Sequence, residues 1–154
     1  LASVVNAEEP AVLWGFIEGY APGASTRDVR LEELVKLALA YYRDFVKPNK
    51  AYRLPTDAER QGLEEMAGWL EAYEAGSASG DEIAATIQNE VYEIGKRCGF
   101  AEDLRAWFKS LYEVLLGQQA GPRFGSFVAY YGASETAALI RQVLSGQQLD
   151  HPAA

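Results

Sequence analysis

Apolar side chains recur at intervals of three and four residues along most of this 154-residue chain. This spacing places them on one face of an α-helix. One clear case consists of Ile83, Ile87, Val91 and Ile94. Alternating runs rich in β-branched residues, which would indicate strands, are missing. The sequence therefore predicts an all-α fold, a compact bundle of about seven to eight helices.

Capping and turn residues divide the chain into these helices. Thr56 with Glu59 and Ser79 with Glu82 have the spacing of capping boxes, in which side chains satisfy the free amides of a helix start. Glycine and proline indicate the other ends. We expect helices at about 11–17, 27–46, 57–73, 80–98, 104–116, 122–131 and 134–144.

The stretch Ala-Gly-Ser-Ala-Ser-Gly at 75–80 has the composition of a flexible linker. We therefore expect two packed helical subunits, with one compact domain over 1–146 as the alternative. The predicted divisions are a first subunit 1–75, a linker 76–80, a second subunit 81–146 and a frayed tail 147–154.

Several helices carry an apolar side that predicts the core. In the helix 27–46 this side consists of Leu31, Leu34, Val35, Ala38, Tyr41, Tyr42 and Phe45. Trp14, Trp69 and Trp107 have apolar neighbours, so we expect them to pack inside as well.

The formal net charge is -8, which argues against indiscriminate binding of nucleic acid. The acidic excess lies in residues 54–103, which hold twelve acidic and three basic side chains. Any RNA contact should therefore avoid the outer face of this segment. No apolar run reaches transmembrane length, and the single Cys98 excludes an internal disulfide framework. We expect a soluble, cytoplasmic protein that binds no membrane.

The chain offers no catalytic constellation. Its one histidine, His151, lies in the tail, and adjacent carboxylates such as Glu32 and Glu33 point in different directions from a helix. A glycine-rich phosphate loop is also missing. We therefore expect no catalytic residue, metal ligand or cofactor in this chain.

Aromatic and basic residues alternate in the segment 41–53. Single-stranded RNA is bound by such mixtures, because bases stack on aromatic rings and phosphates pair with cations. Tyr41, Tyr42 and Phe45 fit a helix core equally well. The RNA-binding candidates here are Arg43, Lys47, Lys50, Tyr52 and Arg53.

A second candidate is the segment Gly-Pro-Arg-Phe-Gly-Ser-Phe at 121–127. Arg123 could pair with a phosphate at a helix start, and Phe124 could stack on a base. A tight turn between two helices is the interpretation that the residues alone favour. Gln88 and Asn89, polar residues within a periodic helix, could read bases or cap a neighbouring element.

Three runs, 41–48, 87–95 and 112–127, strongly resemble the C-terminal region of class I lysyl-tRNA synthetases in order and spacing. Residues 6–10 and 12–16 resemble this family too, so the similarity covers nearly the whole chain. The run 112–127 is the most specific of these.

The resemblance implies a helical region that binds the anticodon stem-loop of lysine tRNA beside an N-terminal catalytic domain, which uses ATP to join lysine to the tRNA. The His-Ile-Gly-His-type and Lys-Met-Ser-Lys-Ser-type signatures of that domain do not occur here. We therefore expect a non-catalytic fragment of a lysine–tRNA ligase. The alternative is a stand-alone helical module that regulates a synthetase or binds a protein partner.

Overall fold

The computed structural model describes residues 8–23, 29–147 and 149. Within these ranges the chain forms seven α-helices and no strand, which confirms the predicted all-α class. None of the described helices is both long enough and apolar enough to cross a membrane. His151 and the greater part of the predicted tail lie outside the described residues.

The chain divides into two compact units, Leu1–Lys50 and Ala51–Ala154. The first unit contains two α-helices and two short continuations of the second helix. In order these are α1 (Pro10–Tyr20), α2 (Val29–Tyr41), the π-helical turn η2 (Tyr42–Val46) and the 3₁₀ turn η3 (Lys47–Asn49). The predicted helix over 27–46 is thus present, and its first two residues lie outside the described range.

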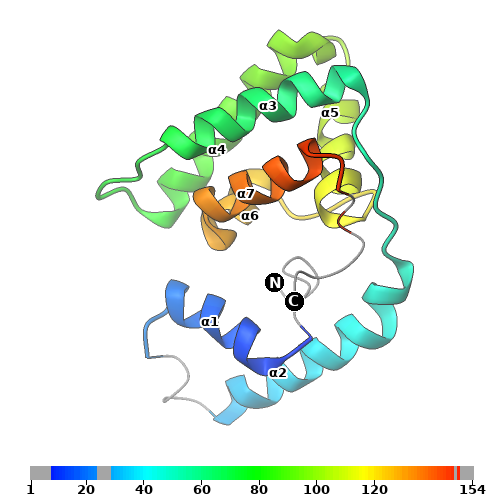
Figure 1. Ribbon diagram of the computed structural model, residues 1–154. Coiled ribbons are helices and arrows are strands. Elements are labelled where there is room, and N and C mark those ends of the chain that lie inside the picture. Colours follow the sequence, from blue (N-terminus) through cyan, green and yellow to red (C-terminus); the bar gives the residue numbers. More distant parts are fainter. Residues whose placement is uncertain (1–7, 24–28, 148, 150–154) are drawn as a thin grey trace. The chain divides into compact units, whose positions relative to one another are not determined.

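The second unit holds the other five α-helices and two π-helical turns (Figure 1). In order these are α3 (Asp57–Ala72), α4 (Gly80–Gly95), η4 (Lys96–Phe100), α5 (Leu104–Leu111), η5 (Tyr112–Leu116), α6 (Phe124–Tyr131) and α7 (Ala133–Leu144).

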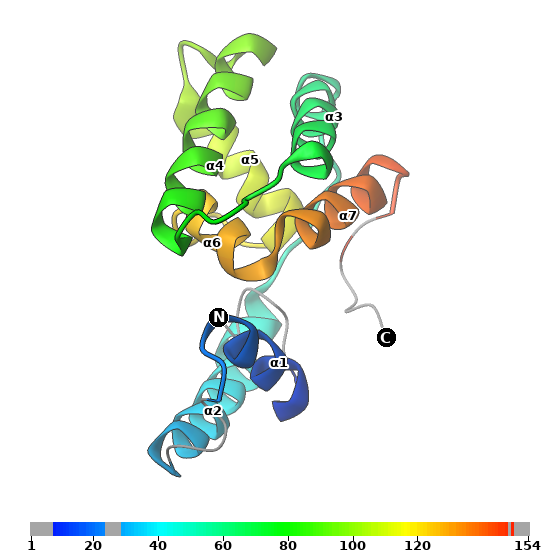
Figure 2. The same cartoon turned by 90° about the vertical axis from the view of Figure 1, so that its left-hand side faces the viewer.

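The boundary between the units lies after Lys50 and not at the predicted linker 76–80. That linker is a turn between α3 and α4, inside the second unit. The helices on its two sides belong to one body because α3 packs against α7 and η4, while α4 packs against α6 and α3 (Figure 2). A flexible composition therefore marked a surface turn rather than a subunit boundary.

Both predicted capping boxes are present. The Thr56 N–H donates to Glu59 Oε2 at 2.9 Å, and the Glu59 N–H donates to Thr56 Oγ1 at 3.4 Å. Ser79 and Glu82 repeat this exchange at the start of α4. The α4–η4 helix ends at Gly99, whose φ of 94° suits glycine and strains other residues.

The core of the first unit is small. Leu13 of α1 packs with Val35, Leu39 and Tyr42 of the second helix. Trp14, Ile17, Ala38 and Val46 cover this cluster and are only partly buried. The predicted core position of Leu34 was therefore wrong, because this side chain is exposed. Tyr41 and Phe45, for which core and surface were both open, are exposed as well.

The second unit is built around Trp107, which is fully buried. Its indole Nε1–H donates to the Val91 carbonyl at 3.0 Å, so the buried polar group is satisfied. The ring lies directly against the backbones of Gly62 in α3 and Gly95 in α4. Trp107 thus joins α3, α4 and α5, as core packing predicted. Trp69 is only half-buried and stacks on Tyr73 at 4.9 Å between ring centroids.

Candidate nucleic-acid interface

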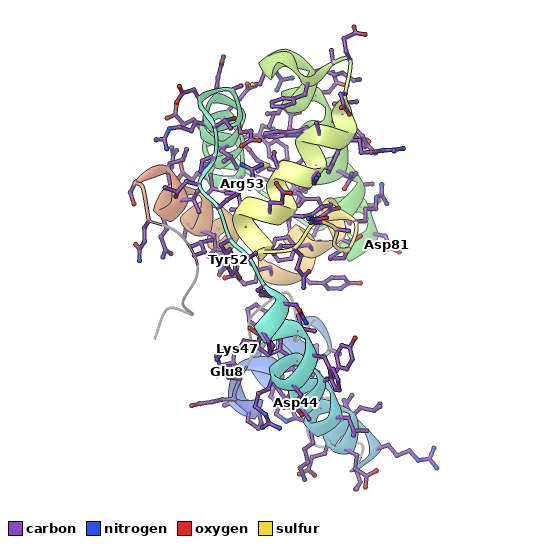
Figure 3. All side chains as sticks on the ribbon, turned by 90° about the vertical axis from the view of Figure 1, so that its right-hand side faces the viewer. Glu8, Asp44, Lys47, Tyr52, Arg53 and Asp81 are labelled. Carbon is purple, nitrogen blue, oxygen red and sulfur yellow. The ribbon has the colours of Figure 1, made fainter. Side chains whose placement is uncertain are left out.

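Two of the predicted RNA-binding cations lie exposed on the first unit. Arg43 Nε donates to Asp44 Oδ1 at 3.0 Å, and Lys47 Nζ donates to Glu8 Oε1 at 2.5 Å (Figure 3). Both pairs are in solvent, where an ion pair contributes about 0–1 kcal/mol. A phosphate could therefore displace these carboxylates at little cost.

The Lys50 side chain is more buried than those of Arg43 and Lys47. Its ammonium group lies 5.6 Å from the centroid of the Tyr42 ring, and Tyr42 itself belongs to the core of the unit. Burial lowers the pKa of Lys50 to about 8. The group still carries most of its charge at neutral pH, but its position over Tyr42 is a packing role as well as a candidate contact.

The exposed aromatic rings of this unit are Tyr41 and Phe45, with centroids 5.4 Å apart. Sequence reasoning left these two open between core and surface. Residues two positions apart in a helix face different directions, so Arg43 does not share their side. The structure therefore separates the cations of this segment from its exposed rings.

Tyr52 lies on the extended segment before α3 (Figure 3). Its ring covers Gly117, where an added Cβ would come within 2.7 Å of the Tyr52 ring. The neighbouring Ala51 N–H donates to the Gly117 carbonyl at 2.8 Å. Tyr52 thereby fastens this segment to the end of η5, and its side chain is half-buried.

Arg53 is committed to two carboxylates of its own unit. It binds Glu59 through Nη1 at 2.8 Å and Nη2 at 2.9 Å, and Nε donates to Glu113 Oε2 at 2.7 Å. These hydrogen bonds, first that to Glu59, raise the already high pKa of Arg53. Burial alone would raise the pKa of Glu59, but the bonds from Arg53 and Thr56 outweigh it and lower that pKa.

A phosphate would therefore have to compete with two carboxylates for Arg53. This residue connects the segment before α3 to α3 and η5, so it is a structural ion-pair centre and a poor candidate for RNA contact. Charge reversal at Arg53 would report on folding.

The predicted turn between helices is present at 117–123. Gly121 lies against the Tyr112 ring, and the Tyr112 hydroxyl donates to the Pro122 carbonyl at 2.8 Å. Arg123 follows as the exposed N-cap residue of α6. Phe124 is fully buried and packs against Phe127, so its ring cannot stack on a base in this structure. The stacking role predicted for Phe124 is corrected to a core role.

Gln88 caps a neighbouring helix. Its side-chain Oε1 accepts the Gly125 N–H at 2.7 Å, and the residue is buried. The amide thus satisfies one of the free N–H groups at the start of α6. Asn89, the next residue, is exposed.

Most cations of the described residues have an intramolecular partner. Arg105 of α5 and Arg123 are exceptions, since both are exposed and form no ion pair or hydrogen bond with a described residue. Arg123 is therefore the predicted site residue most accessible to an anion. No group of three or more metal-ligating side chains occurs within the described ranges.

Comparison with known proteins identifies relatives along almost the entire chain. It is 43% identical over 150 residues to a lysine–tRNA ligase of Roseobacter denitrificans, a match covering 97% of this chain and 27% of the ligase. Lysine–tRNA ligases of Rickettsia bellii and Rickettsia felis are each 40% identical, over 94% and 91% of the chain.

No family model and no solved structure matches the chain. The chain spans about a quarter of the length of the curated relatives it matches. It is thus a homologue of the lysine–tRNA ligases over one part of their length.

Proposed function

We propose that this chain is the C-terminal, anticodon-binding region of a class I lysyl-tRNA synthetase. The observation that carries the proposal is the 40–43% identity to lysine–tRNA ligases over nearly the whole chain. The matched part is only about a quarter of each ligase, which leaves the greater part of those enzymes for catalysis. The chain would then bind the anticodon stem-loop of lysine tRNA in the cytoplasm, and the rest of the parent enzyme would use ATP to join lysine to it.

The charge distribution supports selective rather than general RNA binding. Residues 54–103 are strongly acidic, so RNA would be repelled from much of α3 and α4. Arg123 at the start of α6, and Arg43 with Lys47 on the first unit, lie outside this acidic segment. These three side chains are the proposed phosphate contacts, with the exposed part of Tyr52 as the candidate stacking group.

A binding titration tests the proposal. A fluorescent anticodon stem-loop of lysine tRNA, and one with a scrambled anticodon, are titrated with the chain in moderate salt. The lysine stem-loop should bind more tightly, by about tenfold or more for a base-specific site. Equal or undetectable binding by the folded chain would contradict the proposal and favour the helical interaction module.

Matched variants locate the contact. Arg123→Glu should weaken binding about tenfold, since a lost phosphate contact is replaced by repulsion. Arg105→Glu is its control, because Arg105 is likewise exposed and forms no ion pair with a described residue. On the first unit, the single variants Arg43→Glu in η2 and Lys47→Glu in η3 are each compared with Lys36→Glu in α2, which also reverses one exposed, ion-paired cation. If a variant and its control lower the stem-loop affinity equally, the substituted residue does not contact the RNA.

A further inference from the structure

Four large apolar side chains form a row along the exposed side of the helix that begins with α2. Leu34, Leu37, Tyr41 and Phe45 each keep between 60% and 66% of their surface exposed. They follow one another at intervals of three and four residues, so they lie on one face. Contact between the Tyr41 and Phe45 rings shows that the row continues into η2.

The row lies away from the core of its own unit. Val35, Leu39 and Tyr42 of the same helix are the residues that α1 covers. This unit buries few apolar side chains, and a small unit gains limited stability from such a core. In the second unit the exposed large apolar side chains are Leu54, Tyr92 and Tyr130, one each from three separate segments. The row on α2 is therefore the concentrated apolar surface of the described chain.

We propose that this row is the surface on which the remainder of a lysyl-tRNA synthetase packs. The inference rests on the proposed function, and it names the partner: the part of the same ligase that has no counterpart in this chain. That part amounts to about three quarters of each relative, because the matches cover 26–27% of the ligases. A row of large apolar side chains fits the buried centre of such an interface, which is more apolar than its rim.

The area of the row supports this partner over a second copy of the chain. At about 200 Å² for each large side chain, the four leave on the order of 500 Å² exposed. A stable complex of separate molecules buries about 800 Å² on each partner. A domain of the same polypeptide can pack through a smaller buried area, because the covalent connection gives it a high effective concentration.

The charges beside the row indicate what the partner surface contains. Glu33 lies one helical turn before Leu37, is exposed and forms no ion pair with a described residue. Asp44 lies three residues after Tyr41, and among the described residues its ion-pair partner is the exposed Arg43. Arg30, also exposed, lies one helical turn before Leu34. The matching surface should therefore be apolar, with side chains of both charges at its edge.

Hydroxyl-radical footprinting tests the inference, because it reports the solvent access of side chains. The probe is a chimera in which this chain replaces the homologous quarter of the Roseobacter denitrificans ligase. Labelling of Tyr41 and Phe45 should be about tenfold slower in the chimera than in the chain alone. Tyr130, exposed in the second unit, is the reference for a side chain outside the row. Lysylation by the chimera verifies that it is folded.

Two variants test whether the apolar row is what causes the slow labelling in the chimera. Leu37→Asp with Tyr41→Asp should restore rapid labelling of Phe45 in the chimera, whereas Lys36→Asp on the same helix should not. The double variant should leave the fold of the isolated chain intact, since both side chains are exposed. If the chimera does not fold, the same footprint is taken on the chain joined through a flexible linker to the remaining three quarters of the ligase, because the covalent connection keeps the effective concentration high.

Three results would overturn the inference. Equal labelling of Tyr41 in the chain and the folded chimera would mean that the ligase does not cover the row. Slow labelling in the isolated chain at every concentration would mean that the chain covers it itself, and slowing that grows with concentration would indicate a second copy. Stem-loop binding by the same samples is a separate readout, so loss of RNA binding with a protected row would contradict only the proposed function.

Discussion

The guanidinium of Arg53 holds the carboxylate of Glu59 through two parallel hydrogen bonds of 2.8 and 2.9 Å. Glu59 also completes the capping box of α3 by accepting the Thr56 N–H. One side chain thus fixes both the start of α3 and the extended segment that leads into it. Arg53 belongs to the basic, aromatic segment 41–53, but its role in the structure is to stabilise the fold.

Replacing Arg53 by alanine should lower the free energy of unfolding by about 1–2 kcal/mol, because three charge-assisted hydrogen bonds are lost from a partly exposed site. Arg97→Ala is the control. Arg97 also contacts two carboxylates, Glu65 and Glu90, but it is more exposed, so its loss should lower the free energy of unfolding less than the loss of Arg53 does. Urea unfolding measures the free energy of unfolding of both variants. Equal losses would show that the Arg53 ion pairs stabilise the chain no more than those of Arg97.

The stabilisation from Glu59 should depend on pH. Its pKa is lower in the folded chain than the usual 4.5, so the folded state favours the ionised carboxylate. The contribution is complete above about pH 5 and is lost as the pH falls through the lowered pKa. Glu59→Gln should therefore differ most from the natural chain at neutral pH. The difference in unfolding free energy should shrink toward pH 3, and a constant difference would contradict the assigned shift.

Gly62→Ala should destabilise the second unit by about 1–3 kcal/mol, because the new methyl group would meet the buried Trp107 ring at 2.6 Å. Gly68→Ala in the same helix has no atom within 4 Å of its Cβ and should stabilise the unit by up to about 1 kcal/mol. If the α3 backbone lies against Trp107, thermal unfolding should show a lower unfolding temperature for Gly62→Ala and a higher one for Gly68→Ala. A neutral Gly62→Ala variant would argue against this packing.

Gln88→Leu should cost about 1–3 kcal/mol of stability, because the Gly125 N–H would lose its buried acceptor. The measurement is chemical unfolding together with stem-loop titration. At a temperature where the variant is folded, its RNA affinity should equal that of the natural chain. A selective loss of affinity without a loss of stability would instead assign Gln88 to base recognition.

The sequence determined the helices and several of their ends. Helix ends depend on residues within one turn of backbone, so a local pattern can predict them. Examples are the capping boxes at Thr56 and Ser79 and the glycine at 99. The burial of Trp107 also followed from apolar neighbours on one helix face. The similarity to lysine–tRNA ligases was likewise readable from motifs along the chain.

Tertiary structure alone decided what each side chain faces. Helical spacing gives Leu34 and Val35 similar chances of burial, yet α1 covers Val35 and leaves Leu34 exposed. Phe124 and Arg53 were both candidates for RNA contact. In the structure the Phe124 ring is buried and packs against Tyr112, while Glu59 and Glu113 bind the Arg53 guanidinium. These partners lie six to sixty residues away in sequence. A local pattern carries no information about such distances, because burial and charge pairing depend on which elements the folded chain brings together.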